Sequence, residues 1–349
     1  MNKIKFTRIV LSTLSILIFA GFLFRDLLFL DLPDALILVY ALIGLAFSYL
    51  LCSLLHEIGH LVFGLSQGMR AKRMFFAWFL FDFDEKTVKL QSCEEFGYCT
   101  MTLKRAEHME RKFFVYVAGG LFFSLLYLVF TVFCALRTDV LHFLFGYGLP
   151  VSLYLFLFNA IPLGNDSDGS LILSCIRKDG IFLHIARALV IQSNLEESSP
   201  SEIDESLFDE LPVIPDDHRI FMVMTWLRYL RALDLNDKEE ILRYDYRMRD
   251  ILEYQSEDDL EELYSSILYD CCVFEQNEEG AKGLFERQEP YLIERADSTA
   301  CRILSAYHET YGDETLAESY RQRGIELLSQ EKNIGIRKLE EKLLYKRNA

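Results

Sequence analysis

Four long apolar stretches constrain this chain more than any other feature of its sequence. They cover residues 9–30, 36–65, 113–136 and 141–163. Each is long enough to cross a bilayer, since a transmembrane α-helix needs about 20 apolar residues. Inside lipid, every backbone N–H and C=O must find its partner within the protein, so helices are the expected form. We therefore predict a mainly α-helical, polytopic membrane protein with four transmembrane helices.

Basic residues near these stretches indicate an orientation. One cluster lies at residues 3–8, before the first stretch, and another lies at 70–73, after the second. The N-terminus resembles the start of a signal peptide, but its apolar part is too long and no small-residue cleavage site follows. By the positive-inside rule, both clusters face the cytoplasm. We expect a multi-pass protein of the cell membrane, with its N- and C-termini in the cytoplasm.

The composition changes along the chain, from apolar in the first half to acidic in the second. The net charge of −16 comes mostly from residues after Leu195, which argues against a nucleic-acid partner. The eight cysteines lack zinc-finger spacing and are predicted to be free thiols. We expect four parts: an N-terminal transmembrane helix (1–35), a membrane core (36–192), an acidic linker (193–217) and a cytosolic helical domain (218–349).

The segment after residue 217 is helical in pattern throughout. Candidate helices begin near His218, Asp237, Glu257, Glu278, Ser298 and Glu314. This gives one pair about every 40 residues, within the range of helical repeats. Residues 304–317 resemble part of a tetratricopeptide repeat, and a plain helical bundle is the alternative. Such a domain is expected to offer a surface to a cytosolic protein partner.

Residues 74–111 contain no predicted span. Their first part is aromatic and β-prone, and a turn at 84–86 precedes an alternating segment. This pattern predicts one or two β-hairpins at the membrane surface. A free strand edge there would suit an extended peptide, which can bind by strand addition. A connecting loop with aromatic anchors is the alternative interpretation.

The second apolar stretch contains the pattern H-E-x-x-H, formed by His56, Glu57 and His60. On a helix, residues four apart lie on one face, so both imidazoles can reach one metal ion. In zinc hydrolases two histidines hold the ion, and the carboxylate accepts a proton from the attacking water. The alternative is a pair of core histidines bonded to neighbouring helices. Gly59, between the ligands, would let another backbone come close.

The third apolar stretch has small residues along part of its length. Gly119 and Gly120 are followed by Ser124. Small residues allow helices to approach closely in lipid. We expect this face to pack against the helix that carries the histidines.

Besides the histidine motif, a second polar segment occurs in the apolar half of the chain, at the end of the fourth stretch. Pro162 is expected to end the helix, and the polar residues after it would be costly in lipid unless they lined a cavity. With four spans, this end lies at the same depth as the histidines. A carboxylate is a common third ligand of a two-histidine zinc site, and either Asp166 or Asp168 can supply it.

With both motifs in view, the chain resembles the site-2 protease family of intramembrane zinc metalloproteases. The resemblance covers residues 36–192 and is closest to Gram-positive bacterial members with a cytosolic helical tail. The residues that match the family's two motifs are His56, Glu57, His60, Asn159, Pro162, Asp168 and Gly169.

The resemblance implies a role for each matching side chain. Zinc would be held by His56, His60 and Asp168, with Glu57 as the general base and Asn159 as a donor to the developing oxyanion. Asp166 is the alternative third ligand, because the spacing after the proline departs from the family pattern. Asp168 is preferred, since it keeps the Asp-Gly dipeptide.

The implied activity is hydrolysis of peptide bonds in membrane-anchored substrates, either in regulated intramembrane proteolysis or in processing of peptide or signal remnants. One alternative is a non-catalytic membrane scaffold that has a structural metal site and recruits partners through its helical tail. A metal-responsive transporter ranks last, because the four spans show no inverted repeat.

Overall fold

The structure of the chain, a computed structural model, describes residues 3–30, 32–90, 97–103, 108–137, 140–162, 167–209, 211–255 and 257–345. The chain divides into two compact units, Met1–Phe182 and Leu183–Ala349. Both are mainly helical, and the first also contains a small antiparallel sheet. The predicted mainly α-helical class is therefore confirmed.

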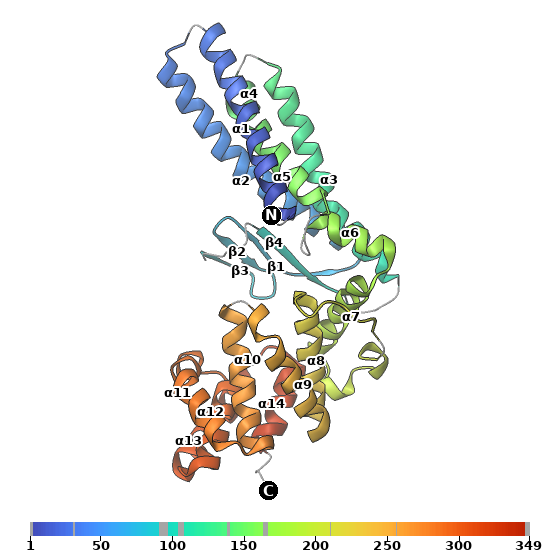
Figure 1. Ribbon diagram of the computed structural model, residues 1–349, viewed down its shortest axis with the longest axis vertical. Coiled ribbons are helices and arrows are strands. Elements are labelled where there is room, and N and C mark those ends of the chain that lie inside the picture. Colours follow the sequence, from blue (N-terminus) through green and yellow to red (C-terminus); the bar gives the residue numbers. More distant parts are fainter. Residues whose placement is uncertain are drawn as a thin grey trace. The chain divides into compact units, whose positions relative to one another are not determined.

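The first unit is built on helices long and apolar enough to cross a membrane (Figure 1). They are α1 (Lys3–Phe29), α2 (Asp34–Ser66), α3 (Met109–Ala135) and the run Val140–Ala160, which α6 (Asp168–Arg177) follows. These are the four apolar stretches that the sequence indicates. Helices α2 and α3 pack closely against each other.

The fourth stretch differs from the single helix expected over 141–163. It consists of α4 (Val140–Phe145), a 3₁₀ turn (Gly146–Gly148) and α5 (Leu149–Ala160). Pro150 lies at the start of α5, where its missing N–H does no harm. A Cβ at Gly146 would lie 2.6 Å from Nδ1 of His142. The break thus occurs where small residues let the backbone fold tightly against its neighbours.

A buried cluster of polar side chains connects the end of α1 to α4 and the 3₁₀ turn after it. Asp26 is 1% exposed, and its Oδ2 lies 2.5 Å from both Nε2 of His142 and Oη of Tyr147. Arg25 pairs with the other oxygen of Asp26 at 2.7 Å and donates to the Ala135 carbonyl at the end of α3. The cluster therefore links α1, α3 and α4 through satisfied polar groups.

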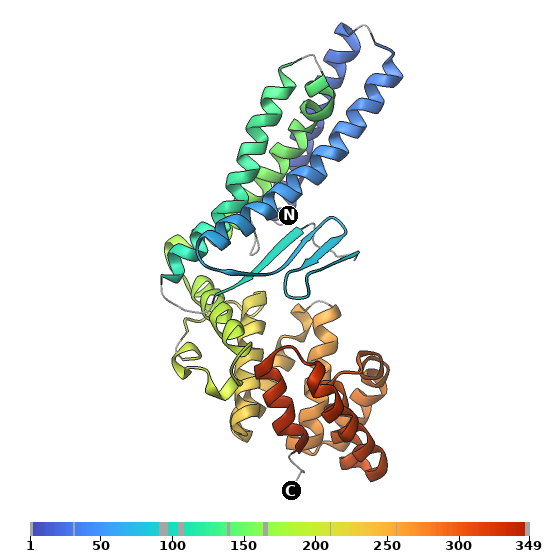
Figure 2. The ribbon, with the colours of Figure 1, turned by 180° about the vertical axis from the view of Figure 1, so that it is seen from behind.

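The segment between α2 and α3 forms a small antiparallel sheet, in agreement with the β-hairpins expected there. Its strands are β1 (Arg70–Phe76), β2 (Phe79–Asp82), β3 (Thr87–Leu90) and β4 (Gly97–Thr102). They are antiparallel in the order β3-β2-β1-β4 (Figure 2). Met74, in β1, pairs with Phe81 of β2 and with Cys99 of β4. The outer strands are therefore β3 and β4.

The second unit is a helical domain with its own core. Its helices are α7 (Gly180–Leu195), α8 (Arg219–Leu235), α9 (Lys238–Asp250), α10 (Glu257–Asp270), α11 (Glu278–Arg295), α12 (Ser298–Tyr311), α13 (Glu314–Leu327) and α14 (Ile334–Tyr345). From α8 to α13, every start lies within one residue of the predicted position. Capping explains the agreement: Asp237, Asn277, Asp297 and Asp313 each accept a backbone N–H of the first turn.

The segment expected as an acidic linker, 193–217, carries short 3₁₀ turns at Pro200–Glu202 and Glu205–Leu207. Two of its apolar side chains, Ile203 and Phe208, are buried in a cluster with Leu227 of α8. Much of this segment is therefore packed against the helical domain.

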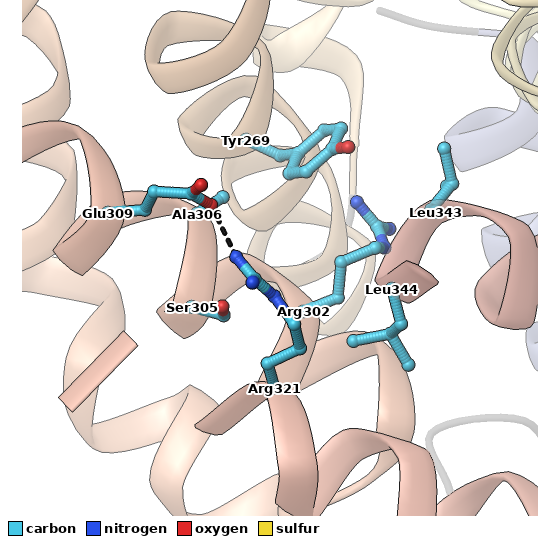
Figure 3. Close-up of a pocket in the computed structure, with 8 residues that line it drawn as sticks. All are labelled: Tyr269, Arg302, Ser305, Ala306, Glu309, Arg321, Leu343 and Leu344. Atoms are coloured by element: carbon cyan, nitrogen blue, oxygen red, sulfur yellow. Dashed lines mark hydrogen bonds and ion pairs between the residues drawn. The ribbon is translucent and has the colours of Figure 1, made fainter. Parts of the chain in front are cut away.

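A pocket of about 260 Å³, counting its open mouth, lies between α10, α12, α13 and α14 (Figure 3). Arg302 lies over the Tyr269 ring, 4.1 Å from its centroid, and bonds Glu340 at 2.7 Å. Arg321 pairs with Glu309 at 2.7 Å. Because both guanidinium groups are bonded to carboxylates of the domain itself, we assign this pocket a structural role.

Candidate metal centre

Three side-chain atoms converge inside the first unit. The Nε2 atoms of His56 and His60 are 3.2 Å apart. Oδ2 of Asp168 lies 3.2 Å from the first and 3.5 Å from the second. Among the described residues, this is the group of three metal-ligating side chains close enough to share an ion.

The spacing of these atoms fits a tetrahedral ion. Zinc binds histidine nitrogen and carboxylate oxygen at roughly 2.0–2.2 Å, which places tetrahedral ligand atoms about 3.3–3.5 Å apart. The three side chains are 12%, 8% and 10% exposed, so the group lies in the interior. Three protein ligands leave one position of a tetrahedron open, as in catalytic zinc sites. The group can hold a metal ion, and Zn²⁺ matches its donor set.

The outer nitrogens of the two imidazoles each have a partner on α3. Nδ1 of His60 lies 3.0 Å from the Tyr116 carbonyl, and Nδ1 of His56 lies 2.9 Å from Oγ of Ser124. A carbonyl can only accept, so the neutral His60 ring carries its proton on Nδ1 and presents a lone pair on Nε2. Partners of this kind orient metal-binding histidines and fix their tautomer.

Glycines set the distance between α2 and α3, as the sequence predicts for Gly59 and Gly119. A Cβ at Gly59 would lie 2.7 Å from the carbonyl carbon of Gly119, so the two backbones touch. A Cβ at Gly120 would lie 2.6 Å from Cε1 of His60 and 2.9 Å from Cε1 of His56. Gly120 thus provides the space that the two imidazole rings occupy.

Asp168 is the first residue of α6, after a cap at Ser167 that accepts the Ser170 N–H. A Cβ at Gly169 would lie 2.6 Å from the Ala160 carbonyl carbon, so α6 begins directly against the end of α5. Burial alone would raise the pKa of Asp168, but the facing imidazoles of His60 and His56 outweigh it and lower that pKa. The carboxylate is therefore ionised at neutral pH.

Glu57 lies beside this group and against the sheet. A Cβ at Gly97, the first residue of β4, would lie 2.7 Å from Oε1 of Glu57. Burial raises the pKa of Cys99 to about 12, with a further contribution from the Glu57 carboxylate. The Tyr116 hydroxyl donates to the Cys99 carbonyl, which joins β4 to α3. The edge strand of the sheet is thus positioned at the carboxylate.

The remaining predicted residues are placed less directly. Pro162 acts as expected: α5 ends at Ala160, and Ile161 is extended with ψ 129°. The Asn159 carbonyl oxygen would lie 3.2 Å from a Cβ at Gly169, which puts the backbone of Asn159 at the α5–α6 junction. Asp166 falls outside the described residues.

Sequence reasoning placed Ser124 on the face expected to pack against the histidine helix, but it missed the bond to His56. It also missed three other members of this site: Tyr116, which bonds His60, and Gly97 and Cys99, which approach Glu57. Ser124 had a signal, as a polar residue one helical turn after a glycine pair. The others lacked one, because their roles depend on tertiary packing. The described cysteines are free and buried, in agreement with prediction.

Comparison with known proteins gives no identification. No family model matches the chain, no similar curated protein is found, and no solved structure resembles it. Its function must therefore be argued from the site itself.

Proposed function

We propose that this chain is a membrane-embedded zinc metallopeptidase of the site-2 protease type, which hydrolyses peptide bonds of membrane-anchored proteins or peptides. The observation that carries the proposal is the convergence of His56, His60 and Asp168 next to Glu57, in a unit built of apolar helices. Ionisable groups among apolar spans are costly, and they usually mark a functional site.

The proposal includes an orientation in the cell membrane. The four apolar helices cross the bilayer, and both termini face the cytoplasm, because the basic clusters at 3–8 and 70–73 follow the positive-inside rule. The metal group then lies near the cytoplasmic end of α2. The helical domain 218–349 lies in the cytoplasm, where it is available to a protein partner.

The ligand set supports a hydrolytic role. A zinc ion held by His56, His60 and Asp168 would supply Lewis acidity, which lowers the pKa of water and polarises a carbonyl group. Glu57 accepts a proton from the attacking water while the oxygen of that water bonds to the carbonyl carbon. Glu57 then returns that proton to the amide nitrogen while the C–N bond breaks, so one carboxylate serves as base and acid.

Two further elements contribute to substrate handling in this proposal. Asn159, at the end of α5, donates a hydrogen bond to the oxygen that gains negative charge. The outer strand β4 begins at Gly97, which lies against the side chain of Glu57, so an extended peptide that adds to this edge would lie near the carboxylate. A helical substrate must unwind locally to bind in this way.

Replacing Glu57 with Gln tests the proposal, because the change removes the proton acceptor and leaves the three ligands in place. Membrane fragments from cells that carry wild-type or Glu57→Gln protein are compared by proteomics, and purified full-length proteins are assayed for bound zinc. We expect substrates to accumulate uncut with Glu57→Gln, at unchanged zinc content. Equal cleavage by both proteins would refute the mechanism. Bound zinc with no cleavage product in wild-type membranes would favour the scaffold.

A further inference from the structure

The two histidines of the metal group are held by partners of different chemistry. His60 faces a backbone carbonyl, that of Tyr116, which can only accept a hydrogen bond. His56 faces the hydroxyl of Ser124, at 2.9 Å from its Nδ1. A hydroxyl can donate or accept, and its hydrogen rotates to suit its partner. The tautomer of His60 is therefore fixed by the fold, and that of His56 is set by a group with two states.

Metal binding selects one of the two orientations of the Ser124 hydroxyl. When Nε2 of His56 binds a metal, it must be free of hydrogen, so Nδ1–H donates to Oγ of Ser124.

We infer that Ser124 is a positioning residue of the metal centre, which accepts a hydrogen bond from Nδ1 of His56 and so holds the ring with Nε2 toward the metal. This inference rests on the proposed metal site and deepens it. The residue is 1% exposed on α3, a helix of apolar composition, so its hydroxyl would be costly to bury without a partner. His56 is that partner.

Loss of the hydroxyl should weaken metal binding without removing a ligand. Substitution of such an outer partner commonly costs about 10–100-fold in metal affinity. Ser124→Ala leaves Nδ1 of His56 without the Ser124 acceptor in the metal-bound state, in a site that is largely buried. Ser124→Thr keeps the hydroxyl and should restore affinity. His60 keeps its carbonyl in every variant, so binding is weakened and not abolished.

The test measures the Zn²⁺ dissociation constant of full-length protein in detergent by competition with a chromogenic chelator. Thr131→Val is the matched control, since Thr131 is buried on the same helix and its hydroxyl bonds Ser152, away from the histidines. We expect the dissociation constant of Ser124→Ala to be about 10–100-fold larger than that of wild type. Those of Ser124→Thr and Thr131→Val should be near the wild-type value.

Two results would overturn the inference: Ser124→Ala binding Zn²⁺ as tightly as wild type, or Thr131→Val losing as much affinity as Ser124→Ala. If Ser124→Thr fails to fold, the ¹⁵N-histidine spectrum decides. The Nδ1–H resonance of zinc-loaded His56 should broaden or vanish in Ser124→Ala, and an unchanged resonance refutes the role. If wild type itself binds no Zn²⁺, the proposed metal site fails, and this inference fails with it.

Discussion

Gly120 offers the sharpest structural test of the metal centre. It lies on α3, opposite the two imidazoles, and makes no bond to either. A methyl group at this position would lie 2.6 Å from Cε1 of His60, whereas ordinary contacts begin at about 3.4 Å. Gly120→Ala therefore requires the ring or the helix to move by about 0.8 Å.

Moving either the His60 ring or helix α3 would cost free energy. The His60 ring is held through Nδ1 by the Tyr116 carbonyl, on the same helix as Gly120. Helix α3 is held against α2 by the contact of Gly59 with Gly119. Overpacking of this kind typically costs 1–3 kcal/mol. Metal–ligand distances tolerate only about 0.2 Å, so Zn²⁺ affinity should fall on the order of 100-fold.

The assay is chelator competition on purified full-length protein, together with zinc content measured by mass spectrometry. Gly21→Ala is the matched control, because a Cβ at this position on α1 meets nothing within 4 Å. The control should fold and bind Zn²⁺ as wild type does. If Gly120→Ala kept wild-type affinity, the imidazoles would not occupy the space that Gly120 provides, and the described geometry would be wrong.

Three further predictions concern other residues. Asp168→Asn should remove zinc from the purified protein, because its carboxylate lies 3.2 Å and 3.5 Å from the two imidazoles; an unchanged zinc content in Asp168→Asn, with loss in Asp166→Asn, would contradict this ligand choice. Burial raises the pKa of Asp245 and that of its neighbour Asp270. The folded domain therefore keeps protons that the unfolded chain releases near pH 4, so its unfolding free energy should fall as pH rises above about 4. Pulse proteolysis of the full-length protein should show the fall, and the double variant Asp245→Asn with Asp270→Asn should flatten it; a slope that persists in the double variant argues against this pair. Gly59→Ala should lower the thermal unfolding midpoint in detergent by overpacking the α2–α3 contact, at about 1–3 kcal/mol, and an unchanged midpoint would show that the helices can separate freely.

Much of the helical framework could be predicted, because its signals are local. Apolar length sets the four long stretches, and caps such as Asp297 and Asp313 mark where helices begin. The break at 146–148 was missed, because an apolar stretch with two glycines also suits an intact helix. Only the packing of α4 and α5 against their neighbours shows that the turn is preferred.

The candidate site divides in the same way. His56 and His60 could be paired from their spacing alone, since one helix fixes both. Asp168 needed a resemblance as well, because its approach depends on how α6 begins against the end of α5. The bonds from Tyr116 and Ser124 could not be predicted, since they depend on how two helices rotate against each other. The rotation of α2 against α3 is set by contact between their backbones, and the only sign of such contact in the sequence is the presence of small residues.

The touching backbones at Gly59 and Gly119 also limit how a polypeptide could reach Glu57. A peptide that entered between α2 and α3 would have to separate two backbones that are in contact. It would also have to break the hydrogen bond of His60 to the Tyr116 carbonyl on α3. A peptide that approached along the sheet, where Gly97 of β4 lies against Glu57, would leave the α2–α3 contact intact. If the proposed function holds, substrate would therefore reach Glu57 from the side of the sheet and not between α2 and α3.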